Sequence, residues 1–156
     1  MKIYKIGIIG CGGIAQKMAA TLEKMKGVER YAVASRNQEK AEAFANKWGF
    51  TKAYGSYEEL ASDPEVDLIY IATPHAMHYD NAHMCIEKGK PVLCEKAFTA
   101  NARQAEDLLT FAKEKGVFIT EAIWTRYMPL SLKIQELLKE GVIGTPYTLS
   151  LTSAIR

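Results

Sequence analysis

The chain has 156 residues, of which 48% are hydrophobic and 24% are charged, and its formal net charge at pH 7 is +2. The length fits about one domain, and the composition is that of an ordinary globular protein. Because basic and acidic residues are interspersed and no apolar run approaches the ~20 residues that span a bilayer, the sequence argues against a nucleic-acid partner and a membrane segment.

The cysteines and the N-terminus indicate a cellular compartment. Cys11, Cys85 and Cys94 are an odd, scattered set without a C-x-x-C pair, which favours free thiols in a reducing environment. The first residues enter a predicted strand directly, without the apolar core of a signal peptide. We therefore expect a cytoplasmic protein.

Short β-rich apolar runs alternate with helical periodicity along the chain, which is typical of a parallel sheet covered on both faces. We predict strands at about 3–9, 29–34, 53–54, 67–72, 91–94 and 117–122. We predict helices at about 13–26, 38–48, 57–62, 76–89, 101–115 and 128–140. This connectivity predicts an α/β fold, a doubly wound parallel sheet with strand order 3-2-1-4-5-6.

The first predicted strand runs into a glycine turn of the form G-x-G-x-x-A, made by Gly10, Gly12 and Ala15. Gly10 suits the tight turn, Gly12 leaves room for a pyrophosphate, and Ala15 lets the next helix pack closely on the sheet. The helix that begins near Gly13 and Ile14 offers free N–H groups and its positive dipole end to the phosphates. The alternative is a tight turn without a ligand. The strand before the turn and the amphipathic run after it favour a dinucleotide site, so we expect the sheet to be an NAD(P)-binding Rossmann fold.

The end of the second predicted strand points to the choice of coenzyme. In a Rossmann fold an Asp or Glu at this position binds the adenosine 2′-hydroxyl of NAD. This chain has Ser35 and Arg36 instead, with Lys40 one helical turn later. A hydroxyl and a guanidinium suit a 2′-phosphate, so we expect NADP rather than NAD. The alternative is a solvated arginine at the start of a helix.

The fourth predicted strand ends in Ala72, Thr73, Pro74 and His75, with His78 in the following helix. These residues lie beside the point where the strand order reverses, which is where ligands bind in such sheets. The two histidines suggest a metal, but no further ligand repeats at metal-binding spacing. We expect cofactor-lining or helix-capping roles and no metal site.

The fifth predicted strand ends with an acid and an amine, Glu95 and Lys96. At the carboxyl edge of the sheet, a lysine could stabilise a developing alkoxide and pass a proton during hydride transfer. Lys96 is therefore the candidate catalytic residue. The alternative is an ordinary surface pair of a lysine and a glutamate.

Four segments, spread in order over nearly the whole chain, share one family pattern. They are Gly10–Ala15, Ala72–His75 with His78, Asn81 and Ala82, Gly89–Lys96, and Gly144–Pro146. Together they resemble the glucose–fructose oxidoreductase/inositol dehydrogenase (Gfo/Idh/MocA) family. Ala34–Arg36 and Glu121–Pro129 are most similar to its dimeric dihydrodiol dehydrogenase branch, which uses NADP.

This resemblance implies an NADP-dependent oxidoreductase that transfers hydride between nicotinamide and a carbinol or carbonyl carbon of a sugar, polyol or dihydrodiol. It makes Lys96 the active-site lysine and places Glu95 beside the nicotinamide. Trp124 and Arg126 would border cofactor and substrate, or else seal a domain junction. Family members usually have proline after the lysine, whereas this chain has Ala97.

The resemblance also implies two regions. Residues 1–122 would form the coenzyme domain, and residues 123–156 a linking helix and the first strand (147–154) of a second domain for substrate binding and dimerisation. On that basis we expect the isolated chain to bind dinucleotide weakly with little turnover, and its full-length parent to be a homo-oligomer. The alternative function is a non-enzymatic dinucleotide-sensing module. Glu95 and Lys96 argue against that alternative, since a sensor needs no lysine beside the nicotinamide.

Overall fold

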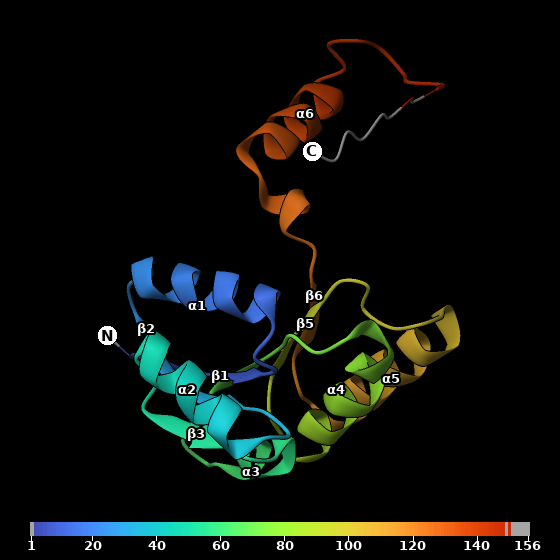
Figure 1. Ribbon diagram of the computed structural model, residues 1–156. Coiled ribbons are helices and arrows are strands. Elements are labelled where there is room, and N and C mark those ends of the chain that lie inside the picture. Colours follow the sequence, from blue (N-terminus) through green and yellow to red (C-terminus); the bar gives the residue numbers. More distant parts are fainter. Residues whose placement is uncertain (1, 149, 151–156) are drawn as a thin grey trace. The chain divides into compact units, whose positions relative to one another are not determined.

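The structure is a computed structural model that describes residues 2–148 and 150. The chain forms two compact units, Met1–Ala122 and Ile123–Arg156. The strands of the first unit are β1 (Tyr4–Ile9), β2 (Val28–Ala34), β3 (Lys52–Tyr54), β4 (Leu68–Ile71), β5 (Val92–Glu95) and β6 (Ile119–Ala122). They form one parallel sheet of order β3-β2-β1-β4-β5-β6 (Figure 1). The predicted doubly wound fold and strand order are confirmed.

Helices cover both faces of this sheet. They are α1 (Gly13–Lys24), α2 (Gln38–Trp48), α3 (Tyr57–Ser62), α4 (His78–Glu87) and α5 (Ala102–Lys115). One buried cluster joins α1 and α2 to the sheet, and a second joins α3, α4 and α5 to it. In β1, Ile8 belongs to the first cluster and Ile9 to the second. Because both faces are buried, the strands read as nearly continuous apolar runs.

The fourth helix begins differently from the prediction. The segment expected to be helical from residue 76 starts as a short 3-10 helix, η1 (His75–Met77), and α4 follows from His78. The N–H of Met77 donates to the carbonyl of Pro74 at 2.9 Å, three residues earlier. This tighter hydrogen bond is the one that defines a 3-10 turn.

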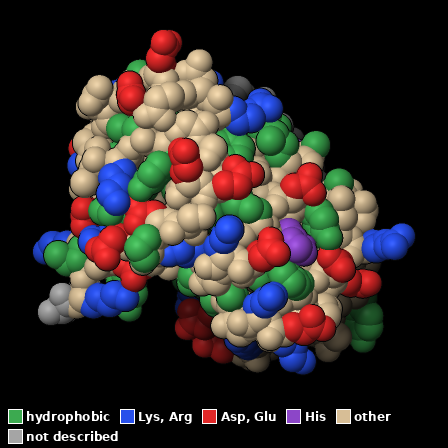
Figure 2. Space-filling view, turned by 90° about the horizontal axis from the view of Figure 1, so that it is seen from below, with side chains coloured by type: hydrophobic (Ala, Val, Ile, Leu, Met, Phe, Trp, Pro, Cys, Tyr) green, Lys and Arg blue, Asp and Glu red, His purple; other side chains and the backbone are tan. Residues whose placement is uncertain are grey.

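The second unit contains η2 (Trp124–Tyr127) and α6 (Pro129–Lys139). Proline suits the first turn of α6 because its missing N–H has no partner there in any helix. Of the strand expected at 147–154, residues 147, 148 and 150 are not in a strand, and the rest lies outside the described residues. No helix within the described ranges is long and apolar enough to cross a membrane. On the face shown in Figure 2, acidic and basic side chains are intermixed.

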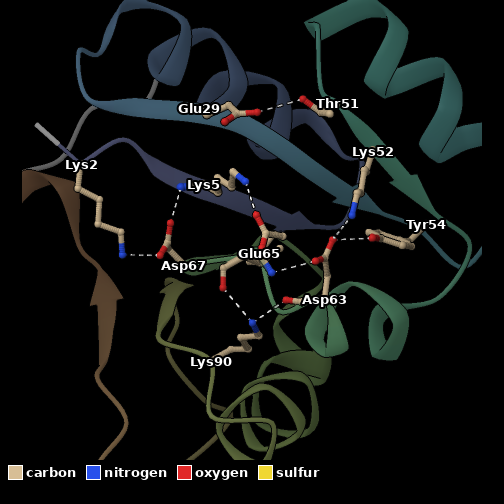
Figure 3. Close-up of polar contacts among 11 residues, drawn as sticks. Lys2, Lys5, Glu29, Thr51, Lys52, Tyr54, Asp63, Glu65, Asp67 and Lys90 are labelled. Atoms are coloured by element: carbon tan, nitrogen blue, oxygen red, sulfur yellow. Dashed lines mark hydrogen bonds and ion pairs between the residues drawn. The ribbon is translucent and has the colours of Figure 1, made fainter.

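A polar network lies at the amino ends of the strands (Figure 3). The buried carboxylate of Asp63 accepts hydrogen bonds from the hydroxyl of Tyr54 at 2.6 Å and the ammonium of Lys52 at 2.9 Å. It also accepts the N–H of Glu65 at 3.0 Å. Lys90 donates to the carbonyl of Asp63 at 2.6 Å. The network therefore joins the starts of β3 and β5 to the loop that leads into β4.

We expect the Asp63→Asn variant to lose a pH-dependent part of its stability. Burial opposes ionisation of Asp63, but the donors from Tyr54, Lys52 and Glu65 outweigh it and lower the pKa from 3.8 to about 2. A lowered folded-state pKa stabilises the protein above the unfolded value and loses that effect as the pH falls through about 2. The expected contribution is about 2 kcal/mol at pH 7.

The measurement is the free energy of unfolding by urea between pH 2 and 7. The stability of the wild-type chain should rise more steeply from acid to neutral pH than that of Asp63→Asn. Glu106→Gln is the control, because Glu106 is an exposed carboxylate on α5. Parallel pH profiles for the wild-type chain and Asp63→Asn would contradict the prediction.

Candidate functional site

The glycine turn lies where β1, β2 and β4 end together. Gly10 has a φ of +103°, and a Cβ built on it would lie 2.8 Å from the carbonyl oxygen of Ala72. Its N–H donates to the carbonyl of Ala34 at 2.9 Å. Only glycine combines this conformation with such a close approach of backbone. The turn is thereby held between the ends of two neighbouring strands.

The first turn of α1 faces open space. Gly12 is the N-cap of α1 and provides no capping side chain. A Cβ added at Gly12 or Gly13 would meet no atom within 4 Å. Ala15 is fully buried against the sheet, whereas Ile14 is partly exposed. The helix therefore packs closely while its first N–H groups keep room for an anion, which fits a pyrophosphate.

At the end of β2, one buried hydroxyl and two exposed cations follow each other. Ser35 is buried, and its hydroxyl oxygen accepts the N–H of Asn37 at 3.4 Å. Asn37 caps α2 by accepting the N–H of Lys40 at 2.8 Å. The side chains of Arg36 and Lys40 are exposed and form no ion pair among the described residues. Their charges are therefore available to a phosphate.

A pocket of about 150 Å³ brings together predicted residues from three parts of the sequence. Ile14, Thr73, His75, Glu95 and Lys96 line it. They come from the start of α1, from the loop after β4 with η1, and from the end of β5. The glycine turn, the segment after β4 and the candidate catalytic lysine thus share one hollow at the carboxyl edge of the sheet, as the Rossmann geometry predicts.

The remaining predicted site residues are not among those that line this pocket. Ala72 and His78 are buried, so neither side chain faces solvent, and Pro74 is exposed. Trp124 and Arg126 belong to the second unit, so their roles stay predictions from the resemblance. Among the described residues no group of three or more His, Cys, Asp or Glu could hold a metal ion.

Glu95 holds the main chain beside Lys96. The hydroxyl of Tyr70 donates a short hydrogen bond to the buried carboxylate of Glu95, and the N–H of Lys96 donates to its second oxygen at 3.2 Å. Burial raises the pKa of Tyr70, and the carboxylate raises it further, so the hydroxyl keeps its proton. The Lys96–Ala97 peptide bond is cis. In the described part of the chain the exposed ammonium of Lys96 has no ion-pair partner, which leaves it available to a ligand.

Sequence reasoning assigned no role to Tyr70 or Asn81. The amide of Asn81 donates to the hydroxyl oxygen of Thr73 at 3.0 Å, which leaves the Thr73 hydroxyl proton free for another acceptor. A tyrosine inside an otherwise aliphatic strand was the available signal for Tyr70, since a buried hydroxyl needs a partner. The signal for Asn81 was its place in the family pattern, which does not say that its amide contacts Thr73.

A larger hollow, of about 610 Å³, lies on α4 and α5 and contains no predicted site residue. Tyr79 and Asp107 line it and are joined to each other by a hydrogen bond of 2.5 Å. Its lining is otherwise made of polar side chains of α5 and of the residue before it, Asn101. Such a polar, open surface has few features of a small-molecule pocket, which is typically concave and mostly apolar.

The sequence matches that of known oxidoreductases. The model of a family described as "Oxidoreductase family, NAD-binding Rossmann fold" matches residues 4–122. A D-xylose 1-dehydrogenase (NADP(+)) from Hypocrea jecorina is 46% identical over 155 residues, which cover 92% of this chain and 40% of that protein. A trans-1,2-dihydrobenzene-1,2-diol dehydrogenase from Mus musculus is 43% identical over 140 residues, covering 88% of this chain and 42% of that protein.

The solved structures that this chain resembles include oxidoreductases as well. An NAD-binding oxidoreductase from Klebsiella pneumoniae has a TM-score of 0.85 and 34% identity, covering 90% of this chain and 40% of that one. A 3-ketoreductase from Actinomadura kijaniata, in complex with TDP-benzene and NADP, has a TM-score of 0.83 and 32% identity over 90% of this chain and 45% of that one. The chain thus spans about two fifths of the length of the curated relatives it matches.

Proposed function

Because this chain belongs to the Gfo/Idh/MocA family of oxidoreductases with an NAD-binding Rossmann fold, we propose that residues 1–122 bind NADP and carry the catalytic lysine of a dehydrogenase. The observation that carries this proposal is the single pocket in which Ile14, Thr73, His75, Glu95 and Lys96 meet. It joins the segment that begins α1 to the lysine at the end of β5.

The parts of the coenzyme would meet different groups of the chain. The open space beside Gly12 and the N–H groups of the first turn of α1 would receive the pyrophosphate. Ser35, Arg36 and Lys40 would hold the adenosine 2′-phosphate, which Arg36 can grip with two donors. Thr73 and His75, together with Glu95, would line the nicotinamide side of the site.

Lys96 would hold and move one proton. When bound, the nicotinamide accepts or supplies the hydride. In the oxidation of a carbinol, the neutral amine form of Lys96 would accept the hydroxyl proton at Nζ, and in the reverse direction the resulting ammonium would donate that proton to the carbonyl oxygen. Glu95 contributes by holding the N–H of Lys96 at 3.2 Å, so that the main chain stays in place while the side chain reaches substrate.

We further propose a sugar, a polyol or a dihydrodiol as the substrate. Supporting this, the two curated relatives described above are named for D-xylose and for a dihydrodiol. The cysteines within the described ranges are all free, which supports a reducing compartment, and we propose the cytoplasm. A homo-oligomeric form of the enzyme is part of the same proposal and rests on the family resemblance.

The test of the coenzyme site is a calorimetric titration of the chain with NADPH and, separately, with NADH. We expect NADPH to bind about tenfold more tightly, a difference of about 1.4 kcal/mol. Arg36→Ala should weaken NADPH binding by about tenfold or more and change NADH binding by less than about threefold, because only NADPH carries the 2′-phosphate.

Arg103→Ala is the matched control, because Arg103 is an exposed arginine on α5. It should leave both affinities unchanged. Equal affinity of the wild-type chain for NADPH and NADH would reject the NADP assignment. An Arg36→Ala variant that weakened both coenzymes equally would assign Arg36 to a different part of the site.

A further inference from the structure

The imidazole of His78 contacts two main-chain carbonyls. The side chain is fully buried at the start of α4. Its Nδ1 lies 2.8 Å from the carbonyl oxygen of Ala97, and its Nε2 lies 2.9 Å from that of Thr73. Both distances are typical of hydrogen bonds. One ring thus bridges the loops that follow β4 and β5.

Neither carbonyl accepts a hydrogen bond from the described backbone. Thr73 and Ala97 lie outside helices and strands, and in residues 2–148 no backbone N–H donates to either oxygen. Thr73 is buried, so its carbonyl needs a donor, and an unsatisfied one costs about 1–3 kcal/mol, whereas Ala97 is an exposed residue. Among the described side chains, that of His78 contacts both carbonyls.

The tautomer decides which carbonyl receives the proton. A neutral imidazole has one N–H, which donates to the carbonyl of Thr73 from Nε2 or to that of Ala97 from Nδ1. In either form the ring stays between the two carbonyls, because the side chain is fully buried.

The two loops that the ring joins carry residues of the pocket. Thr73 lines it directly, and Lys96 lines it and is bonded through its peptide to Ala97. The next residue, Phe98, donates its N–H to the carboxylate of Glu121 at 3.0 Å. The loop after β5 is therefore held from α4 on one side and from β6 on the other.

We propose that His78 is a positioning residue, whose buried ring links the carbonyls of Thr73 and Ala97 and so holds Thr73 and Lys96 in the pocket. Its effect on the coenzyme is indirect, because its side chain is not exposed. Only this effect on the coenzyme rests on the proposed function. The link between the two loops is a property of the chain without a ligand.

The first test is an NMR measurement on the unliganded chain labelled with ¹⁵N-histidine. We expect a ring N–H of His78 to exchange slowly with solvent, because it is buried and lies within hydrogen-bond distance of a carbonyl, and the signal is assigned by its loss in His78→Gln. Rapid exchange of every ring N–H of His78 would overturn the proposal. This experiment uses the wild-type chain, so it does not depend on whether a variant folds.

The second test compares His78→Gln with His83→Gln. His83 lies on the same helix, where its ring stacks on Phe111. We expect amide hydrogen exchange at Lys96 and Phe98 to become about tenfold faster in His78→Gln, as for the loss of about one hydrogen bond, and to be unchanged in His83→Gln. Uniformly faster exchange over all of α4 and β5 would indicate a merely structural role and would overturn the proposal.

The third measurement is NADPH affinity. We expect His78→Gln to weaken NADPH binding by about three- to tenfold, and His83→Gln to leave it unchanged. Unchanged binding in His78→Gln would overturn the positioning role. Failure of the wild-type chain to bind NADPH would instead count against the proposed function, since the exchange of the ring N–H and of the backbone amides is measured without coenzyme.

Discussion

Replacing Gly10 by alanine is expected to lower the free energy of unfolding by about 2–5 kcal/mol, a large part of the total stability of a domain. Two effects add. The backbone at Gly10 has a φ of +103°, which an alanine rarely adopts, and the new Cβ would lie 2.8 Å from the carbonyl oxygen of Ala72. The carbonyl belongs to the residue that follows β4, whose N–H donates to the carbonyl of Ile9 in β1 at 2.8 Å, so it cannot move without disturbing the sheet. Urea unfolding of the unliganded chain measures the loss.

Gly12→Ala is the matched control for this prediction. Gly12 has a φ of −81°, and its Cβ would meet nothing within 4 Å. The unfolding free energy should therefore change by less than about 1 kcal/mol. NADPH affinity should nevertheless fall by about tenfold or more, because the methyl group would fill the space proposed for the pyrophosphate. Normal NADPH binding by Gly12→Ala would show that the pyrophosphate does not bind at this turn.

Replacing Lys96 by alanine is expected to lower the rate of hydride transfer by about 10²–10⁴-fold, the usual contribution of a positioned acid or base. The affinity for NADPH should change by less than about tenfold, since the fingerprint and Arg36 would hold most of the coenzyme. Lys96→Arg should be nearly as slow, because arginine keeps the charge but cannot release a proton. A variant that lost coenzyme binding and turnover together would assign Lys96 to binding alone.

The measurement is the initial rate of NADP reduction over a panel of sugars, polyols and dihydrodiols. It is made on the chain itself and on the chain joined to the remaining region of one of the longer relatives, since the match covers about two fifths of their length. Lys88→Ala is the control, because Lys88 lies at the exposed end of α4. Its rate should equal that of the unsubstituted protein.

Much of the candidate site could be predicted from the sequence because Rossmann chemistry is local along the chain. Gly10, Gly12 and Ala15 follow one strand, and Glu95 and Lys96 end another. Each motif lies at a strand end, and the order of parallel strands brings those ends to one edge. The shared pocket of Ile14, Thr73, His75, Glu95 and Lys96 follows from that rule.

The sequence was less informative about the hydrogen-bond partners of buried polar side chains. The histidine at 78 was expected to line the cofactor or cap a helix, and the structure buries it between two carbonyls. Likewise, no sequence pattern singles out Asp63 near the end of a short helix, yet its carboxylate is buried and accepts hydrogen bonds from Lys52 and Tyr54. These contacts join residues 5 to 19 positions apart, and no periodicity encodes them.

Local patterns were therefore sufficient for the strands, the helices, the order of the sheet and the glycine fingerprint. Hydrophobic periodicity and turn chemistry act over a few residues, and the handedness of parallel connections leaves few topologies. The tertiary structure alone decided how the ends of β4 and β5 are held: Tyr70 on Glu95, Asn81 on Thr73, and His78 on both loops. A buried polar group must find a partner, but which partner it finds depends on the packing of the whole sheet and its helices.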